Sequence, residues 1–467
     1  MPSLFSGIHM ALQSLLAHQQ AMQVIEHNVA NANTPGYSRQ EAILKPGSPY
    51  PATSFIRAGL PGQIGTGVLV DRVQRFHNEF VDERLRDENA LFSRWSVQEQ
   101  LLRHIEIALN ETQTDGLLAK LDLFWEGWRS LSTDPSNHAL RLDLLERSKS
   151  LAMALQNRAQ QLRTIRAEQD LEISQRVAEI NRLADLVARL NAEIANVISV
   201  GDQPNDLMDQ RDLALSRLAA LAGADSHIQS NGDVMVSIGG HALVTGTSTF
   251  ELQALPDPSN NNLIGITWSD GQSYAGVNGE LAGLLAVRDG ILVDRLNALD
   301  DFASALASRV NEIHRNGFGL NDATGLDFFT GSDALTLRVN DVLDSTENIA
   351  AAGSPMSPGD GSVAEAIADV RTERLMTAGT ATLDQFYSGE LVTLGLEIQK
   401  AERLANDRQL VLDSLGMQKE SLAGVSLDEE AAKMIQSQRA FQAASRLMTT
   451  LDEMLDRIIN RMGRVGI

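Results

Sequence analysis

Apolar residues at the start of the chain follow a helical spacing. Between Leu4 and Ala32 they recur every three or four residues, and neither Pro nor Gly occurs between Ile8 and Thr34. This spacing places side chains along one narrow stripe of a helix, which is the pattern of a coiled-coil seam. We therefore predict one long helix here. Its stripe, called the first seam, consists of Leu4, Ile8, Ala11, Leu15, Met22, Ile25 and Val29.

A turn motif ends this predicted helix. Asn31 is followed by Thr34-Pro35-Gly36-Tyr37, in which Pro and then Gly occupy the two central positions that a type II turn requires. The helix before it is nearly free of charge, because the first 38 residues contain one acid, Glu26, and no Lys or Arg. Uncharged polar side chains cost less to bury than ions, so we expect this helix to be covered on several sides.

The end of the chain mirrors the beginning. Ser426 and Glu429 have the spacing of a capping box, and a segment without Pro or Gly follows to Arg461. We expect this helix to bury its stripe against the first seam or against neighbouring subunits. The polar positions His18 and Gln438 within the two stripes are expected to set the register. The second seam consists of Leu427, Met434, Phe441, Met448, Leu451, Leu455 and Ile458.

The middle of the chain predicts further helices and a small β insertion. Residues 136–200 lack Pro and Gly and keep helical spacing, which predicts a helix of about 95 Å, and a second helix is expected over 205–221. From 225 the pattern changes to alternating apolar and polar residues, and it shows short apolar runs beside Asn-Gly and Asp-Gly, as in β-hairpins.

Beyond the insertion, helical spacing returns over 292–313 and again over 391–422, where Gly395 and Gly416 could interrupt the helix. Residues 316–380 are rich in Gly, Ser, Asp and Ala and predict loops with short elements. Earlier in the chain, Gly62, Gly65 and Gly67 stand before Val68, which predicts a bend followed by a strand.

These elements define the expected fold class and domains. The fold is mainly α with a β insertion (α+β), elongated and multidomain, since 467 residues exceed one domain at about 100–200 residues each. We expect a terminal coiled-coil core domain (1–60 with 425–467) and a long-helix shell domain (61–224 with 281–424, including the loop-rich 316–380). The β insertion (225–280) is expected to form a small outer domain.

The amino-acid composition argues against several classes of function. The formal net charge is −22, from 39 basic and 61 acidic residues, and no basic patch interrupts it, which argues against nucleic-acid binding. The chain has no cysteine, so disulfides, thiolate metal sites and cysteine nucleophiles are absent. No stretch is apolar enough to span a membrane, and the start lacks the basic region of a cleaved signal peptide. We expect no membrane insertion.

No catalytic, cofactor or metal motif emerges from the residue spacing. His9, His18 and His27 are nine residues apart, so successive ones fall on opposite faces of a helix. P-loop, H-E-x-x-H and G-x-S-x-G patterns are missing. The acids at 202, 206, 209 and 212 could bind calcium, but acids in a first helical turn also complement the helix dipole, and we favour that structural role. Asp322 and Asp327 are interpreted as turn residues. We therefore expect no enzyme and no cofactor.

Five stretches of the chain carry a resemblance to a known family. The stretch from Asn28 to Gln40, NVANANTPGYSRQ, resembles the N-terminal signature of bacterial flagellar rod, hook and hook-associated proteins. The stretches PNDLMDQRD (204–212), RDG (288–290) and ATGLDFF (323–329) are similar to the hook-associated protein 1 family, and the stretch from Ser426 to Ala444 also matches. The resemblance runs from end to end and is weakest in the β insertion.

This resemblance implies a structural subunit at the junction between hook and filament, needed for filament assembly. It implies export through the flagellar type III channel without a cleaved signal peptide, and a place in the extracellular flagellum. The implied partners are a ring of like subunits, hook protein, hook-associated protein 3, and an export chaperone on the C-terminal helices. Alternatives are a hook or rod subunit, a flagellum-associated peptidoglycan hydrolase, and a cytosolic coiled-coil adaptor.

Overall fold

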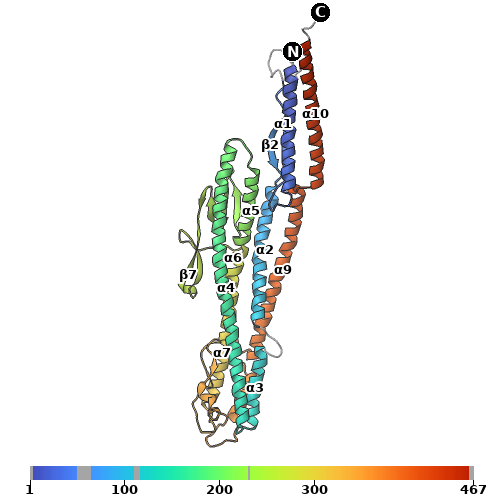
Figure 1. Cartoon of the computed structure of the whole chain (residues 1–467). Helices are drawn as coiled ribbons and strands as arrows, with labels where there is room; N and C mark the ends of the chain where they lie inside the picture. Colours follow the sequence, from blue (N-terminus) through green and yellow to red (C-terminus); the bar gives the residue numbers. More distant parts are fainter. Residues whose placement is uncertain (1–3, 50–64, 110–115, 230–231, 462–467) are drawn as a thin grey trace, which may run out of the picture. The chain divides into compact units, whose positions relative to one another are not determined.

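The computed structural model describes residues 4–49, 65–109, 116–229 and 232–461 (Figure 1). Its α-helices are α1 (Leu4–Ala30), α2 (Glu79–Leu109), α3 (Leu117–Thr133), α4 (His138–Ser199), α5 (Asn205–Ala222), α6 (Gly279–Ala286), α7 (Leu292–Arg315), α8 (Ser362–Asp369), α9 (Leu383–Ala423) and α10 (Leu427–Arg461). Its strands are β1 (Gln40–Pro46), β2 (Val68–Arg75), β3 (Asp225–Ile228), β4 (Val234–Ile238), β5 (His241–Thr245), β6 (Ser248–Thr249), β7 (Leu252–Asp257), β8 (Leu263–Trp268), β9 (Phe329–Thr330) and β10 (Arg338–Val339).

The predicted fold class, mainly α with a small β insertion, is confirmed. The chain forms two compact units. The first contains Met1–Ala90, Ile180–Glu251 and Arg408–Ile467, and the second contains Leu91–Glu179 and Leu252–Asp407. The inserted strands divide between them, since the sheet β3-β4-β5-β6 belongs to the first unit and the hairpin β7-β8 to the second. No helix in the described ranges is long and apolar enough to cross a membrane.

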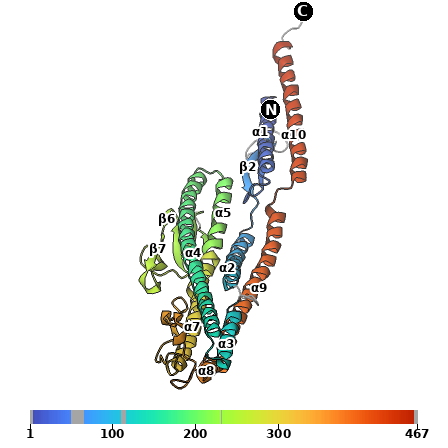
Figure 2. The same ribbon diagram turned by 60° about the horizontal axis from the view of Figure 1, so that its bottom comes forward.

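In the first unit, α1 and α10 lie side by side and run antiparallel (Figures 1 and 2). Near the start of α1, a methyl group added to Gly7 would lie 3.1 Å from Leu451 Cδ1. Near the end of α1, Asn28 bonds Glu430 in the first turn of α10. The two helices of the predicted seams are therefore neighbours, and coiled-coil packing between them remains a prediction.

At the inner ends of these two helices the predicted turn is confirmed, and the Ser426 half of the predicted capping box is present. Tyr37 N–H donates to Thr34 O at 3.2 Å and Gly36 has a φ of +80°, which confirms the type II turn. At the start of α10, Ser426 Oγ accepts from Glu429 N–H at 3.4 Å. The Glu429 carboxylate lies 3.4 Å from Arg39 Nη1.

The predicted long helix is confirmed as α4, of 62 residues, and the helix after it as α5. Gly223 ends α5 in the left-handed conformation, with its N–H bonded to Ala219 O at 2.8 Å. The sheet β3-β4-β5-β6 is held to α4 by the buried Asn191, whose amide bonds both the N–H and the carbonyl of Val234. β4 and β8 occupy the two predicted apolar runs.

The second unit has one large apolar core. It gathers side chains from α3, α7, α8 and α9, from parts of α2 and α4, and from the loop-rich region. Aromatic rings lie at its centre, where Trp128 and Phe328 have ring centroids 5.0 Å apart. Residues 316–380 form short strands, single helical turns and the short helix α8, as predicted. Asp322 lies in a turn with a φ of +60°, which confirms its predicted role.

Several elements differ from the sequence prediction. Helices α2 and α3 and strand β1 were not predicted, whereas β2 begins at the expected Val68. Gly62 lies outside the described residues. Helix α9 begins at Leu383 rather than 391 and continues through Gly395 and Gly416. A glycine inside a helix costs only about 0.5–1 kcal/mol, which the burial of Leu394 and Ile398 on the same helix offsets.

Candidate functional site: a joint at the base of the terminal helices

Arg39 lies where α1 leads into β1 and contacts three other parts of the first unit. Its N–H donates to Ala423 O at the end of α9, at 2.9 Å, and its carbonyl accepts from Phe76 N–H after β2, at 2.8 Å. Its guanidinium lies 5.0 Å from the centroid of the Phe76 ring, and its Nε donates to Glu430 Oε1 at 3.0 Å. We call this set of contacts, with those of Asn28 and of α5 described next, the joint.

Asn28 in the last turns of α1 is fully buried and uses every hydrogen-bonding position of its amide. Its Nδ2 donates to Gln40 O and to Glu430 Oε2, each at 2.8 Å. Its Oδ1 accepts from Gln40 N–H at 2.9 Å and from the Tyr37 hydroxyl at 2.8 Å. A buried polar group that is completely satisfied specifies one arrangement of its neighbours. Asn28 therefore fixes α1, the turn, β1 and α10 relative to one another.

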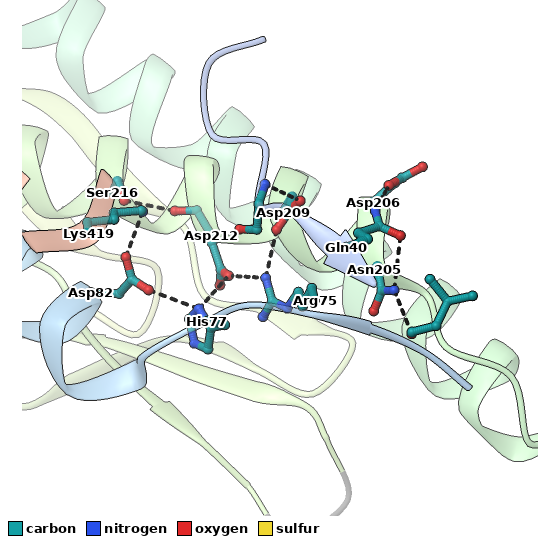
Figure 3. A network of polar contacts seen from close by, with 12 residues as sticks. Gln40, Arg75, His77, Asp82, Asn205, Asp206, Asp209, Asp212, Ser216 and Lys419 are labelled. Carbon is teal, nitrogen blue, oxygen red and sulfur yellow. Dashed lines mark hydrogen bonds and ion pairs between the residues drawn. The ribbon is translucent and has the colours of Figure 1, made fainter. Parts of the chain in front are cut away.

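Helix α5 closes the joint on a second side (Figure 3). Asp209 accepts from Ser38 N–H at 2.9 Å and from Arg75 Nη1 at 2.9 Å. One helical turn earlier, Asp206 accepts from Gln40 Nε2 at 2.7 Å, and Asn205 Nδ2 donates to Gln40 Oε1 at 3.1 Å. The start of β1 is thereby tied to the first turns of α5.

The polar contacts continue from α5 toward α2 and α9 (Figure 3). Arg75 also bonds Asp212 at 2.6 Å, His77 bonds Asp82 at 2.9 Å, and Lys419 of α9 bonds the same Asp82 at 2.6 Å.

Burial raises the pKa of Asp82, but hydrogen bonds from His77 and Lys419 outweigh this effect and lower the pKa to about 2. Burial raises the pKa of Asp209 more than Ser38 and Arg75 lower it. The ionised form of Asp82 is thus favoured by its partners, whereas burial disfavours the ionised form of Asp209.

These carboxylates serve as hydrogen-bond acceptors that connect different elements of the first unit. Within the described residues, no group of three or more His, Asp or Glu is placed to hold a metal ion. Asp206 lies in the first turn of α5, where an acid complements the helix dipole, in agreement with the structural role favoured from the sequence. The polar contacts of the joint therefore have a structural role, because they hold separate chain segments together.

The seam residues occupy a range of environments. In the first seam, Ala11 and Ile25 are buried, and Ile8, Leu15 and Met22 are half-buried, whereas Val29 is exposed. In the second seam, Met434, Phe441, Met448, Leu451 and Leu455 are half-buried, and Leu427 and Ile458 are exposed. Of the two polar stripe positions, His18 is half-buried and Gln438 is exposed. The helix pair thus leaves part of both stripes uncovered.

Comparisons with known proteins agree with this architecture. The family described as the flagellar hook-associated protein FlgK helical domain matches residues 102–329, and the family described as the flagellar basal body rod FlgEFG protein C-terminal matches residues 421–462. The solved structure of the flagellar hook junction protein FlgK from Burkholderia pseudomallei shares the fold. Its TM-score is 0.64 at 15% identity, with 73% of this chain and 100% of that chain covered.

The two family matches define a structural, axial-type subunit of the bacterial flagellum. Flagellar hook-associated protein 1 of Bacillus subtilis (strain 168) is 31% identical over 508 residues, covering 100% of both chains. The protein of the same name from Escherichia coli (strain K12) is 30% identical over 336 residues, covering 69% of this chain and 60% of its own length. The chain belongs to the flagellar hook-associated protein 1 family.

Two of the sequence motifs lie together in the structure. Segments 28–40 and 204–212, which carry the resemblance, meet at the joint through Ser38, Gln40, Asn205 and Asp209. Arg75 was not singled out from the sequence, and Glu430 appeared only as part of a matching stretch. The signal that could have identified them is weak, because their partners lie 134 and 402 residues away in the chain.

Proposed function

We propose that the chain is the structural subunit of the hook–filament junction and that the joint sets the direction of its terminal helices for assembly. The observation that carries this proposal is the meeting of the two motif segments around Asn28, Arg39 and Asp209. A subunit that builds a tube needs its assembling helices held at one angle to the rest of the molecule. A network in which buried polar groups are satisfied only in one arrangement supplies that constraint.

The proposal also assigns a role to each part of the chain. Residues 1–60 and 425–467 act as the core domain, with both seams as assembly surfaces, and the long helices form the surrounding shell. Residues 225–280 supply the outward-facing β region. The exposed positions of both seams support this assignment, because apolar positions left uncovered in the single chain are available to neighbouring subunits.

The same proposal names partners and place. Copies of this chain form a ring that contacts hook protein on one side and hook-associated protein 3 on the other. An export chaperone covers the C-terminal helices before assembly, and the protein works outside the cell as part of the flagellum. The work is done by surfaces, and the subunit catalyses no reaction.

Incubation of the purified full-length protein with isolated hooks tests this function. Electron microscopy of the hooks should show added density at their distal ends and nowhere along their length. Absence of added density, under conditions where the hooks accept another axial protein, would contradict the proposal. A parallel incubation with peptidoglycan tests the hydrolase alternative, since sustained release of fragments would favour an enzyme.

A further inference from the structure

A pocket of about 490 Å3 opens in the second unit between α4, the β7-β8 hairpin and α7. Sites for small molecules usually enclose roughly 300–1,000 Å3. The contributing residues of each helix are three or four positions apart, so each helix presents one face to the pocket. The residues that decide its chemistry are Arg163, Arg166 and Ala167 of α4, Leu263 of β8, and Val293 and Leu296 of α7.

Arg166 lines this pocket with part of its guanidinium unused. Its Nε donates to Arg288 O at 3.1 Å and its Nη2 to Asn260 Oδ1 at 2.7 Å, and both acceptors are neutral. The nearest carboxylate oxygen among the described residues is Asp289 Oδ1, 4.0 Å from Nη2. The Arg166 Nη1 is accessible and has no hydrogen-bond partner in the described ranges. Donors of a charged group are therefore open to a ligand.

The acids near Arg166 are already paired with another arginine. Arg288 is buried in a π-helical turn (Val287–Ile291) that leads into α7, and it holds Asp289 through Nε at 2.8 Å and Nη2 at 2.7 Å. Its Nη1 donates to Asp170 Oδ1 at 2.7 Å. This pairing gives the RDG motif a role, because it leaves Arg166 without a bonded carboxylate. π-helical turns inside helices are frequent at functional sites.

Arg163 adds a second positive charge one helical turn before Arg166. Its side chain is exposed, and it forms no ion pair with any described residue. Like charges at neighbouring positions of a helix face repel each other, and an anion bound by both would relieve this repulsion. Asp300, the acid among the pocket walls, accepts from Ala334 N–H through Oδ1 at 2.9 Å. Two arginines against one acid leave the pocket positive, although the whole chain has a net charge of −22.

Apolar side chains form the rest of the pocket. Leu263, Val293 and Leu296 are half-buried, and a ligand that covers them removes apolar surface from water. Ala167 is the next residue on the Arg163 face of α4 and extends only a methyl group, which leaves room beside the two arginines. A planar carboxylate matches the paired N–H groups of a guanidinium. The walls thus fit a carboxylate that carries an apolar chain.

We propose that this pocket binds a small organic carboxylate with an apolar chain. The carboxylate lies between Arg163 and Arg166 Nη1, and the chain covers the three apolar side chains of the pocket. The site shares no residue with the joint or with the terminal helices, so it goes beyond the assembly role and can fail without affecting it.

Equilibrium dialysis of the full-length protein against radiolabelled octanoate tests the site. Octanoate has about ten non-hydrogen atoms, which support a Kd in the millimolar range or tighter. We expect saturable binding at one site. Acetate lacks the apolar chain and octylamine carries the opposite charge, so each should compete at least roughly tenfold more weakly than unlabelled octanoate. Equal competition by either compound would overturn the proposal, because the pocket would then not select a carboxylate with an apolar chain.

Two variants locate the binding. Arg163→Gln removes an exposed charge, and we expect it to weaken octanoate binding roughly tenfold. Its control is Arg403→Gln, which removes an exposed arginine of α9 outside the pocket and should bind like the wild type. Ala167→Phe fills the pocket and should abolish saturable binding, whereas Ala178→Phe, at an exposed position of the same helix, should not.

Circular dichroism should show that all four variants keep the helical content of the wild type. No saturable binding to the wild type overturns the proposal, as does wild-type affinity in both Arg163→Gln and Ala167→Phe.

Discussion

Arg39 and Glu430 form an ion pair across 391 positions of sequence, with Arg39 Nε 3.0 Å from Glu430 Oε1. The Glu430 side chain is 1% exposed, whereas that of Glu429, which also meets Arg39, is 62% exposed. The two neighbouring carboxylates thus share one guanidinium in very different surroundings, and they form a matched pair for experiment.

Glu430→Gln should destabilise the protein by about 1.5–3 kcal/mol, because a hydrogen bond to a charged group is lost where water cannot replace it. Glu429→Gln should change stability by about 0.5 kcal/mol or less, as is typical of an exposed pair. Urea unfolding of both variants checks this difference. Equal effects would mean that the buried pair does not hold α10 to the joint.

Asn28→Asp should destabilise the joint by about 3 kcal/mol or more at neutral pH, since it sets a second carboxylate beside Glu430 in a buried site. Adding Glu430→Gln should recover about 1–3 kcal/mol, because the new amide at position 430 can donate to the new carboxylate. A double-mutant cycle measured by urea unfolding gives this coupling directly. Additive effects would show that the two side chains do not interact.

Gly36→Ala should destabilise the protein by about 1–2 kcal/mol, because φ at this position is +80° and an L side chain is strained there. The control is Gly395→Ala, where the helical backbone suits alanine and an added methyl meets nothing within 4 Å. That substitution should stabilise by about 0.5–1 kcal/mol. Thermal melting distinguishes the two, and a neutral Gly36→Ala would argue against the turn.

The contrast between Gly36 and Gly395 shows which structural features could be predicted from the sequence. Proline followed by glycine specifies a turn through local backbone preference, so the turn and the long helices α4 and α10 could be predicted from residues near one another in the chain. The glycines of α9 suggested breaks that do not occur, because contacts distant in sequence hold the helix. Asn28 and Glu430 could not be paired from the sequence, since 402 positions separate them and no periodicity links them.

His314 predicts a pH dependence of the second unit. The ring is 1% exposed, its Nδ1 lies 2.7 Å from Leu326 O, and Nε2 accepts from Ala350 N–H at 2.9 Å. Burial lowers the pKa of His314 from 6.5 to about 4, although the bond to Leu326 opposes this. The unfolded chain therefore takes up a proton at this position before the folded chain does. The stabilisation is complete above pH 6.5 and is lost as the pH falls toward 4.

The difference between these pKa values corresponds to roughly 3 kcal/mol. Denaturant unfolding from pH 7 to pH 4, followed by tryptophan fluorescence, measures it, because Trp128 lies 6.3 Å from the His314 ring. His314→Gln, which can still donate and accept, should lose this part of the pH dependence. Parallel pH profiles of variant and wild type would contradict the assignment.

The most direct test of the joint compares three full-length proteins on isolated hooks by electron microscopy: the wild type, Asn28→Asp, and Asn28→Asp combined with Glu430→Gln. The fraction of hooks with added density at the distal end is measured for each. We expect the wild type to add density, Asn28→Asp to add much less, and the double variant to recover. If Asn28→Asp assembled as well as the wild type despite a destabilised joint, the joint would not be what positions the terminal helices for assembly.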